Sequence, residues 1–108
     1  MAQVKTLQGT VLKLALNFSF PASESVTLDT IDFYTEWYCD KGRVLRLDKG
    51  ALVRVLEEDV PVWYAFIDTG VVGKGYLRMR LHASIPDDDA PNGIRTEYAE
   101  IDTGIIIA

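Results

Sequence analysis

Hydrophobic and polar side chains alternate along several short stretches of this chain. In the first stretch, every second residue from Leu12 to Phe20 is leucine or phenylalanine, and Pro21 follows directly. A period of two places the apolar side chains on one face of a β-strand. Proline ends such a strand because it lacks the N–H that the ladder needs. We therefore predict a strand with one buried face over residues 12–20.

Seven further stretches have strand character. Two of them alternate without interruption, and their buried sides are predicted to be Ile31, Phe33, Thr35 and Trp37 in one and Leu77, Met79 and Leu81 in the other. Residues 62–67 are dense in aromatic and aliphatic side chains and are predicted to form a buried strand. In chain order, the seven strands are predicted at residues 31–38, 43–47, 51–56, 62–67, 76–83, 94–101 and 104–107.

Glycine, proline and aspartate mark the connections between these strands. Asp40-Lys41-Gly42 and Asp48-Lys49-Gly50 are turn signals, because glycine adopts positive φ without strain. Residues 70–75 are predicted to be a glycine-rich connection and residues 86–93 a polar loop. Residues 57–59 are predicted to end in one helical turn, which Pro61 prevents from extending.

Seven or eight short strands separated by such turns predict an all-β fold. The expected architecture is an antiparallel β-sandwich of the immunoglobulin or jelly-roll kind. The 108 residues suffice for one core and leave two independent cores marginal, so residues 1–108 are predicted to be a single domain.

Composition narrows the function classes. Cys39 is the only cysteine, so an internal disulfide is excluded. The net charge of -5 argues against nucleic-acid binding, which requires neutralisation of phosphates. No apolar run reaches the roughly 18 residues of a membrane span. The first 16 residues lack the features of a signal peptide, so we expect neither a membrane partner nor export.

The triplet Asp-Thr-Gly occurs twice, at residues 68–70 and 102–104. Aspartic proteases use this triplet because two carboxylates must share one proton. Here the triplets are too close in sequence for two lobes, and Val71 and Ile105 follow where the protease motif prefers alanine or serine. We expect instead that each aspartate forms an Asx turn where a strand ends or breaks.

Other chemical motifs are incomplete. Residues 70–75 lack the spacing and the helix of a phosphate-binding loop, so a turn between two strands is expected. Residues 87–93 do not fit a helix-flanked calcium loop, although whether Asp87, Asp88 and Asp89 bind an ion stays open. His82 and Cys39 cannot complete a zinc site alone, and His82 is expected to be an ordinary surface histidine. We expect no enzymatic activity, no cofactor and no metal.

The polar sides of two predicted strands combine tyrosine with arginine. Such residues are enriched at protein interfaces and also stack on sugars. Alternatively, opposite charges simply pair across the strands. The apolar end of the chain, residues 104–107, must be covered within the fold or by a neighbour. The candidate interface residues are Tyr34, Tyr38, Tyr76, Arg78, Arg80, Ile105 and Ile107.

One stretch of the chain carries a family resemblance. Its specific part runs from Gly73 to Gly104 and contains Gly73-Lys74-Gly75-Tyr76-Leu77, Ser84-Ile85-Pro86-Asp87-Asp88-Asp89 and Asn92-Gly93-Ile94-Arg95-Thr96-Glu97. This string resembles small virion proteins of tailed phages and prophages of Bacteroides-type gut bacteria. More distantly, the chain is similar to the N-terminal β-sandwich of phage baseplate upper proteins.

The resemblance implies a non-enzymatic structural role. The expected function is an adaptor or fibre-attachment subunit on a head fibre, tail or baseplate, assembled in the host cytoplasm into a virion. The expected partners are copies of itself and other virion proteins, because repetition makes small contacts sufficient. The alternative is a carbohydrate-binding β-sandwich module that uses Tyr34, Tyr38 and Tyr76 on a glycan. Position in the particle, symmetry and partner identity stay open.

Overall fold

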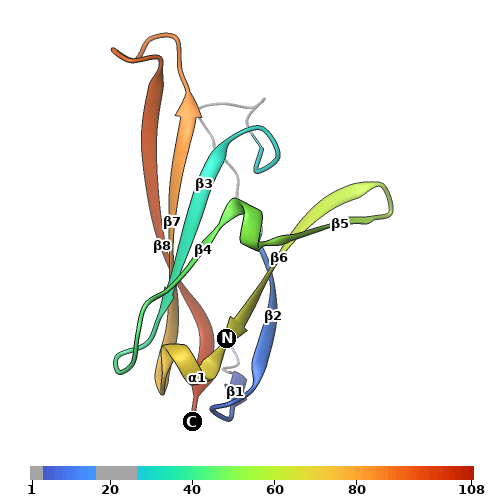
Figure 1. Cartoon of the computed structure of the whole chain (residues 1–108), viewed down its shortest axis with the longest axis vertical. Helices are drawn as coiled ribbons and strands as arrows, with labels where there is room; N and C mark the ends of the chain where they lie inside the picture. The colour runs from blue at the N-terminus through green and yellow to red at the C-terminus, as the bar shows by residue number, and fades with distance from the viewer. Residues whose placement is uncertain (1–3, 17–26) are drawn as a thin grey trace.

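A computed structural model shows eight β-strands and two short helical turns, and it describes residues 4–16 and 27–108 (Figure 1). In chain order, the elements are β1 Val4–Thr6, β2 Val11–Leu16, β3 Asp32–Tyr38, β4 Leu45–Asp48, the 3-10 turn η1 Lys49–Ala51, β5 Val53–Glu57, β6 Val60–Asp68, α1 Thr69–Val72, β7 Gly75–Pro86 and β8 Ile94–Ile107. The predicted all-β sandwich is confirmed.

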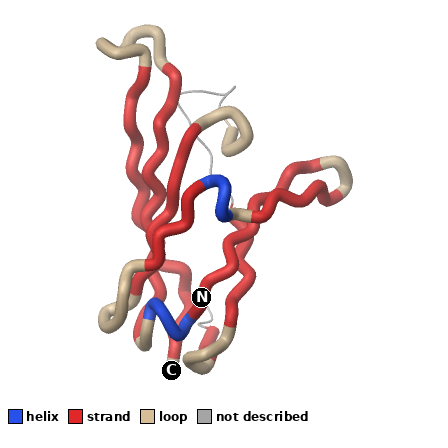
Figure 2. The backbone as a smooth tube through the Cα atoms, in the orientation of Figure 1, coloured by secondary structure: helices blue, strands red, loops and turns tan. Residues whose placement is uncertain are grey.

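Two sheets form the layers. The larger sheet has the order β1-β8-β7-β3-β4 and the smaller one has the order β2-β6-β5. The tube in Figure 2 shows the long β7–β8 hairpin on one side and the β5–β6 hairpin projecting on the other. All pairs are antiparallel except β1 with β8, which is parallel. This pair departs from the expected all-antiparallel arrangement.

The larger sheet follows the predicted alternation. Phe33, Thr35 and Trp37 of β3 are buried, and so are Leu77, Met79 and Leu81 of β7. Thr35 is the polar exception, since its hydroxyl donates to the carbonyl of Leu47 and accepts from the indole N–H of Trp37. The core therefore contains no unsatisfied hydroxyl at this position.

The smaller sheet completes the core from the other side. Leu12, Leu14 and Leu16 face inward from β2 as predicted, whereas the continuation to Phe20 lies outside the described residues. Trp63 of β6 meets Phe33 of β3 edge to face, with ring centroids 5.9 Å apart. This aromatic pair joins the two layers.

Three local expectations are wrong, and one strand was not predicted. Residues 57–59 form no helical turn: Glu58 and Asp59, at φ 50 and φ 65, make a two-residue hairpin turn between β5 and β6. Residues 62–67 are buried on one face only, because Phe66 is exposed. The two strands predicted near the C-terminus are one strand, β8, which is irregular where its register with β7 shifts. β1 had no alternation long enough to predict it.

Close backbone contact explains two glycines in the loops around α1. A Cβ atom at Gly73 would lie 2.0 Å from the carbonyl oxygen of Lys41, and one at Gly42 would lie 2.3 Å from that of Val72. Both residues also have positive φ. The glycine-rich connection therefore packs against the 40–42 turn, as a turn between strands rather than a phosphate loop.

The molecule is less compact than its length suggests. Its radius of gyration is 15.0 Å, and its principal extents are 45 × 34 × 28 Å. A compact chain of this length has a radius of about 13 Å. The two projecting hairpins account for the difference (Figure 1).

Candidate protein interface

The outer surface of the larger sheet carries most of the predicted interface residues. We call it the polar outer face and define it by Tyr34, Glu36, Tyr38, Arg46, Asp48, Arg78, Arg80, His82, Tyr98 and Glu100. Its members come from β3, β4, β7 and β8 because one face of a sheet collects alternate residues of every strand. In register, Glu36 lies between Arg46 and Arg80, and Tyr34 lies beside His82.

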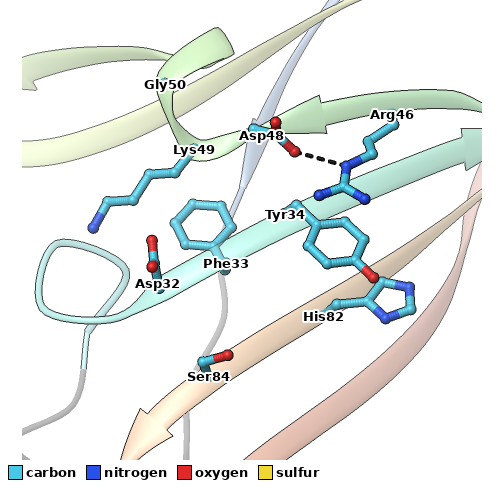
Figure 3. A pocket seen from close by; sticks show the side chains of 9 residues that line it. All are labelled: Asp32, Phe33, Tyr34, Arg46, Asp48, Lys49, Gly50, His82 and Ser84. Atoms are coloured by element: carbon cyan, nitrogen blue, oxygen red, sulfur yellow. Dashed lines mark hydrogen bonds and ion pairs between the residues drawn. The ribbon is translucent and has the colours of Figure 1, made fainter.

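Tyr34 is enclosed by its neighbours. The guanidinium of Arg46 lies 3.8 Å from the ring centroid, and the ring of His82 stacks on it at 4.4 Å. These two residues come from the strands on either side of β3, and Figure 3 shows Tyr34 between them. Both flat faces of the ring are therefore occupied, and neither is free to stack on a sugar.

A pocket of about 330 Å³ opens beside Tyr34. It is lined by Asp32, Phe33, Tyr34, Arg46, Asp48, Lys49, Gly50, His82 and Ser84 (Figure 3). Three of its charged side chains already have internal partners: Arg46 donates to Asp48 at 2.8 Å, and the Lys49 ammonium donates to the carbonyls of Asp29 and Ile31. The pocket is a depression in the outer surface of the larger sheet.

His82 is more enclosed than expected. Its Nε2 lies 2.6 Å from Oε1 of Glu36, its ring meets Tyr98 edge to face, and its side chain is only 17% exposed. The prediction of an ordinary surface histidine is therefore wrong. Cross-strand stacking and pairing hold it in place instead.

Tyr38 and Arg80 also interact across strands. The guanidinium of Arg80 lies 4.4 Å from the Tyr38 ring centroid, and the Tyr38 hydroxyl donates to Glu100. The hydrogen bond to the Glu100 carboxylate, together with partial burial, raises the pKa of Tyr38 above its usual value. Arg78 lies 3.6 Å from Asp40. The side chains of the polar outer face are thus paired with one another, as expected if opposite charges simply pair across the strands.

The other three predicted interface residues, Tyr76, Ile105 and Ile107, differ in exposure. Tyr76 is 42% exposed and stays accessible at the start of β7. Ile105 and Ile107 point into the core, and Ile107 is only 1% exposed. These two isoleucines are not surface residues, because β1 pairs alongside them and the smaller sheet packs over them. We therefore remove them from the candidate interface.

The two Asp-Thr-Gly triplets lie on different sheets and form the same local structure. Asp68 accepts a hydrogen bond from the N–H of Gly70, and Asp102 accepts one from that of Gly104. Each threonine hydroxyl donates to a backbone carbonyl on a neighbouring strand or loop, of Thr10 and of Leu77. The predicted Asx turns are confirmed, and the triplets act as strand-ending or strand-bending motifs.

The other polar motifs also have local structural roles. Asp87 accepts from the N–H of Asp89 and lies 3.2 Å from Arg95, so it holds the loop at the end of the β7–β8 hairpin. Burial raises the pKa of the Cys39 thiol, whose sulfur contacts the carbonyl of Gly75. Within residues 4–16 and 27–108, no three His, Cys, Asp or Glu side chains gather closely enough to hold a metal ion. No helix in the same residues is long and apolar enough to cross a membrane.

A second surface was missed by sequence reasoning. The outer side of the smaller sheet carries five exposed apolar residues, which we call the apolar outer face: Val11, Val53, Val55, Val60 and Phe66. Polar residues lie among them, since Lys13 is opposite Phe66, Glu57 is opposite Val60 and Tyr64 is opposite Val53. The exposed fractions of the five apolar residues run from 37% at Val55 to 59% at Val11 and Val60. The signal was present in the sequence, since valine alternates with arginine at residues 53–55. The alternation alone does not show that these valines are exposed, because apolar residues in a strand pattern usually indicate the buried face.

Comparison with known proteins adds no relative. No protein-family model, no curated protein and no solved structure matches the chain.

Proposed function

We propose that this chain is a non-enzymatic structural subunit of a tailed-phage virion. Its role is that of an adaptor or fibre-attachment domain on a head fibre, tail or baseplate, and it acts through protein–protein contacts in an oligomer. The observation that carries the proposal is the apolar outer face. Five apolar side chains lie on one side of one sheet with exposed fractions of 37% to 59%, and Lys13, Glu57 and Tyr64 lie among them. Apolar residues mixed with polar ones in this way are typical of a surface that another protein covers.

The shape supports the same role. Every residue of β5 is exposed, and the β5–β6 hairpin projects from the body (Figure 2). The exposed valines of this hairpin give a neighbouring subunit a surface to bind. Binding there requires no change in the packing of the core. The phage assignment itself comes from the resemblance of residues 73–104, on which the β7–β8 hairpin is built.

The carbohydrate-binding alternative has less support. Sugar-binding modules offer the flat face of an aromatic ring, and both faces of Tyr34 are covered. Tyr76 is the remaining exposed candidate of the three tyrosines first considered. A glycan array that compares the wild type with Tyr76→Ala tests this alternative directly.

The proposed function is tested by assembly. Light scattering on the purified chain, alone and with the products of neighbouring genes, should show a species larger than the monomer. The double variant Val55→Thr/Phe66→Ser should weaken binding to those gene products, because it makes two of the five residues of the apolar outer face polar. The matched control is Ile94→Thr, which changes a similarly exposed residue at the far end of the molecule.

The melting temperature of each variant should stay close to that of the wild type, since all three side chains are at least 37% exposed. A chain that remains monomeric with every neighbouring gene product contradicts the proposal. So does a double variant that binds the neighbouring gene products as well as Ile94→Thr does.

A further inference from the structure

Within residues 4–16 and 27–108, the larger sheet has two edges without a partner strand. β4 is the last strand on one side, and on the other side β1 pairs only with residues 105–107 of β8. Among the described residues, no strand pairs with the outer side of β8 from residue 94 to 104. Open edges of this length present free N–H and C=O groups to another chain.

The two edges carry opposite charge. Residues 40–49, around β4, contain four basic residues (Lys41, Arg43, Arg46 and Lys49) and two acidic ones (Asp40 and Asp48), and the side chain of Arg46 is 58% exposed. The free part of β8 contains three acidic residues, Glu97, Glu100 and Asp102, and one basic residue, Arg95, which pairs with Asp87 and Glu97. An edge with basic residues and an edge with acidic residues attract each other, whereas two acidic β8 edges repel.

We propose that β4 of one copy of this chain adds to the free part of β8 in the next copy, so that the larger sheets continue from subunit to subunit. The inference rests on the proposed function and names its partner as a second copy. Because the two edges differ, the contact is head-to-tail. Repetition closes a ring or, if the rotation does not close, extends a filament.

Strand direction is compatible with this joint. β4 and β7 are both antiparallel to β3, and β8 is antiparallel to β7, so β4 and β8 run in opposite directions. Copies related by an axis along the strands therefore bring β4 and β8 together as an antiparallel pair. The polar outer faces of successive copies then lie on the same side of the continued sheet.

One register satisfies both faces of the sheet. Arg46 of one copy lies opposite Glu100 of the next, and on the inner face Leu45 meets Ile101 while Leu47 meets Ala99. A shift of one residue turns the apolar side chains to the wrong face. A shift of two residues in one direction places Leu47 opposite Glu97, which is unfavourable. A shift of two in the other direction places Arg46 opposite Asp102 but Asp48 opposite Glu100, so one attractive pair is offset by one repulsive pair.

The joint also covers an apolar cleft. A cleft of about 280 Å³ between the two sheets is lined by Leu14, Ala15, Leu16, Trp37, Met79, Ile101, Thr103 and Ile105. Ile101 belongs to the free part of β8 and is 37% exposed. Leu45 of the incoming β4 lies beside Ile101 in the proposed register and extends the apolar cover over the cleft.

The existing contacts of the two charged residues do not block the joint. Arg46 donates to Asp48 through Nε, which leaves its other guanidinium N–H groups free for a second carboxylate. Glu100 accepts from Tyr38 and has further lone pairs. The Arg46 guanidinium also lies over the ring of Tyr34 on β3, so it must turn from that ring toward the free edge of β4 to reach Glu100 of the next copy.

The test is a charge swap read by sedimentation velocity over a range of protein concentrations. Arg46→Glu and Glu100→Arg should each weaken self-association about tenfold, because attraction becomes repulsion. The double variant R46E/E100R should restore it, since the two exchanged charges are again opposite in sign and face each other across the joint. Lys13→Glu, on the outer side of the smaller sheet, and Asp88→Arg, in the loop of the β7–β8 hairpin, change the net charge by the same amounts away from the joint and should associate like the wild type.

Each outcome decides the inference. Loss in both single variants with recovery in the double variant supports the joint. Single variants that behave like their controls place the contact elsewhere and overturn it, while the proposed function stands. A dimer that is sensitive to R46E but not to E100R indicates β4 pairing with β4 and also overturns it. A wild-type chain that stays monomeric at every concentration overturns it too, and the proposed function then depends on other virion proteins.

Discussion

At the scale of single residues, the polar groups that matter most for the fold are tied to groups on other strands. Thr35 and Asp29 are the clearest cases. Thr35 is fully buried, and its hydroxyl is hydrogen-bonded to Leu47 and Trp37. Asp29 accepts hydrogen bonds from Arg54 and from the indole N–H of Trp63. Each links segments that are distant in sequence, so each supports more than its own turn.

Replacing Thr35 with valine should destabilise the protein. Valine keeps the volume but removes the hydroxyl, which leaves the indole N–H of Trp37 and the carbonyl of Leu47 without this partner. The expected loss is about 1–3 kcal/mol of the free energy of unfolding. Chemical denaturation measures it, with Thr35→Ser as the control that keeps the hydroxyl. Equal losses in both variants would show that the methyl group, not the hydroxyl, is important.

Asp29 should make stability dependent on pH in the acid range. Its hydrogen bond to Arg54, together with those from Trp63 and the nearby Lys49 charge, lowers its pKa below the usual 3.8 despite partial desolvation. A lowered pKa in the folded state means that the stabilisation is present above pH 3.8 and is lost as the pH falls through the folded-state value.

The variant Asp29→Asn should therefore show a flatter dependence of unfolding free energy on pH below about 4 than the wild type. Denaturation curves at a series of acidic pH values measure this slope. Asp88→Asn, in the exposed loop of the β7–β8 hairpin, is the control. A wild-type slope in Asp29→Asn would mean that the Arg54 pair is screened by solvent.

At the scale of elements, the β5–β6 hairpin has the least favourable turn residues. A turn with two positive φ values favours asparagine and glycine, and here it consists of Glu58 and Asp59. The helical turn that the sequence suggested fails because the pairing of Glu57 with Val60 forces the two central residues into the left-handed region. Pairing of the flanking strands thus overrides local preference.

Replacing these residues with Asn-Gly should stabilise the hairpin. Glu58→Asn/Asp59→Gly relieves backbone strain and should raise the free energy of unfolding by about 1 kcal/mol. Thermal denaturation measures the shift in melting temperature. Asp59→Ala, which adds no preference for positive φ, should not stabilise the protein. A stabilisation of the same size in that control would point to removal of the acidic charge instead.

At the scale of the whole molecule, the protection of backbone amides from hydrogen exchange should differ between the two sheets. β3 and β7 lie inside the larger sheet with strands on both sides, whereas β5 is an edge strand whose five residues are all exposed. Hydrogen exchange at low protein concentration should therefore be slowest in β3 and β7 and fastest in β5. Slow exchange throughout β5 under those conditions would contradict this ranking and would mean that the hairpin is covered.

Alternation in the sequence determined which residues of β2, β3 and β7 face the core. The inward sides of β3 and β7 were predictable because their buried and exposed positions differ strongly in polarity. The Asx turns at Asp68 and Asp102 were predictable as well, since that interaction spans only two residues. These features depend on short-range sequence and need no knowledge of the partner strands.

Only the tertiary structure decided which apolar residues are covered. Ile107 and Phe66 both lie in apolar strands, yet Ile107 is buried by β1 and the opposite sheet, and Phe66 is left on an outer face. Likewise, His82 is enclosed because β3 and β8 bring Tyr34 and Tyr98 to it. Burial depends on which strands become neighbours, and that is a property of the assembled sheets rather than of any one strand.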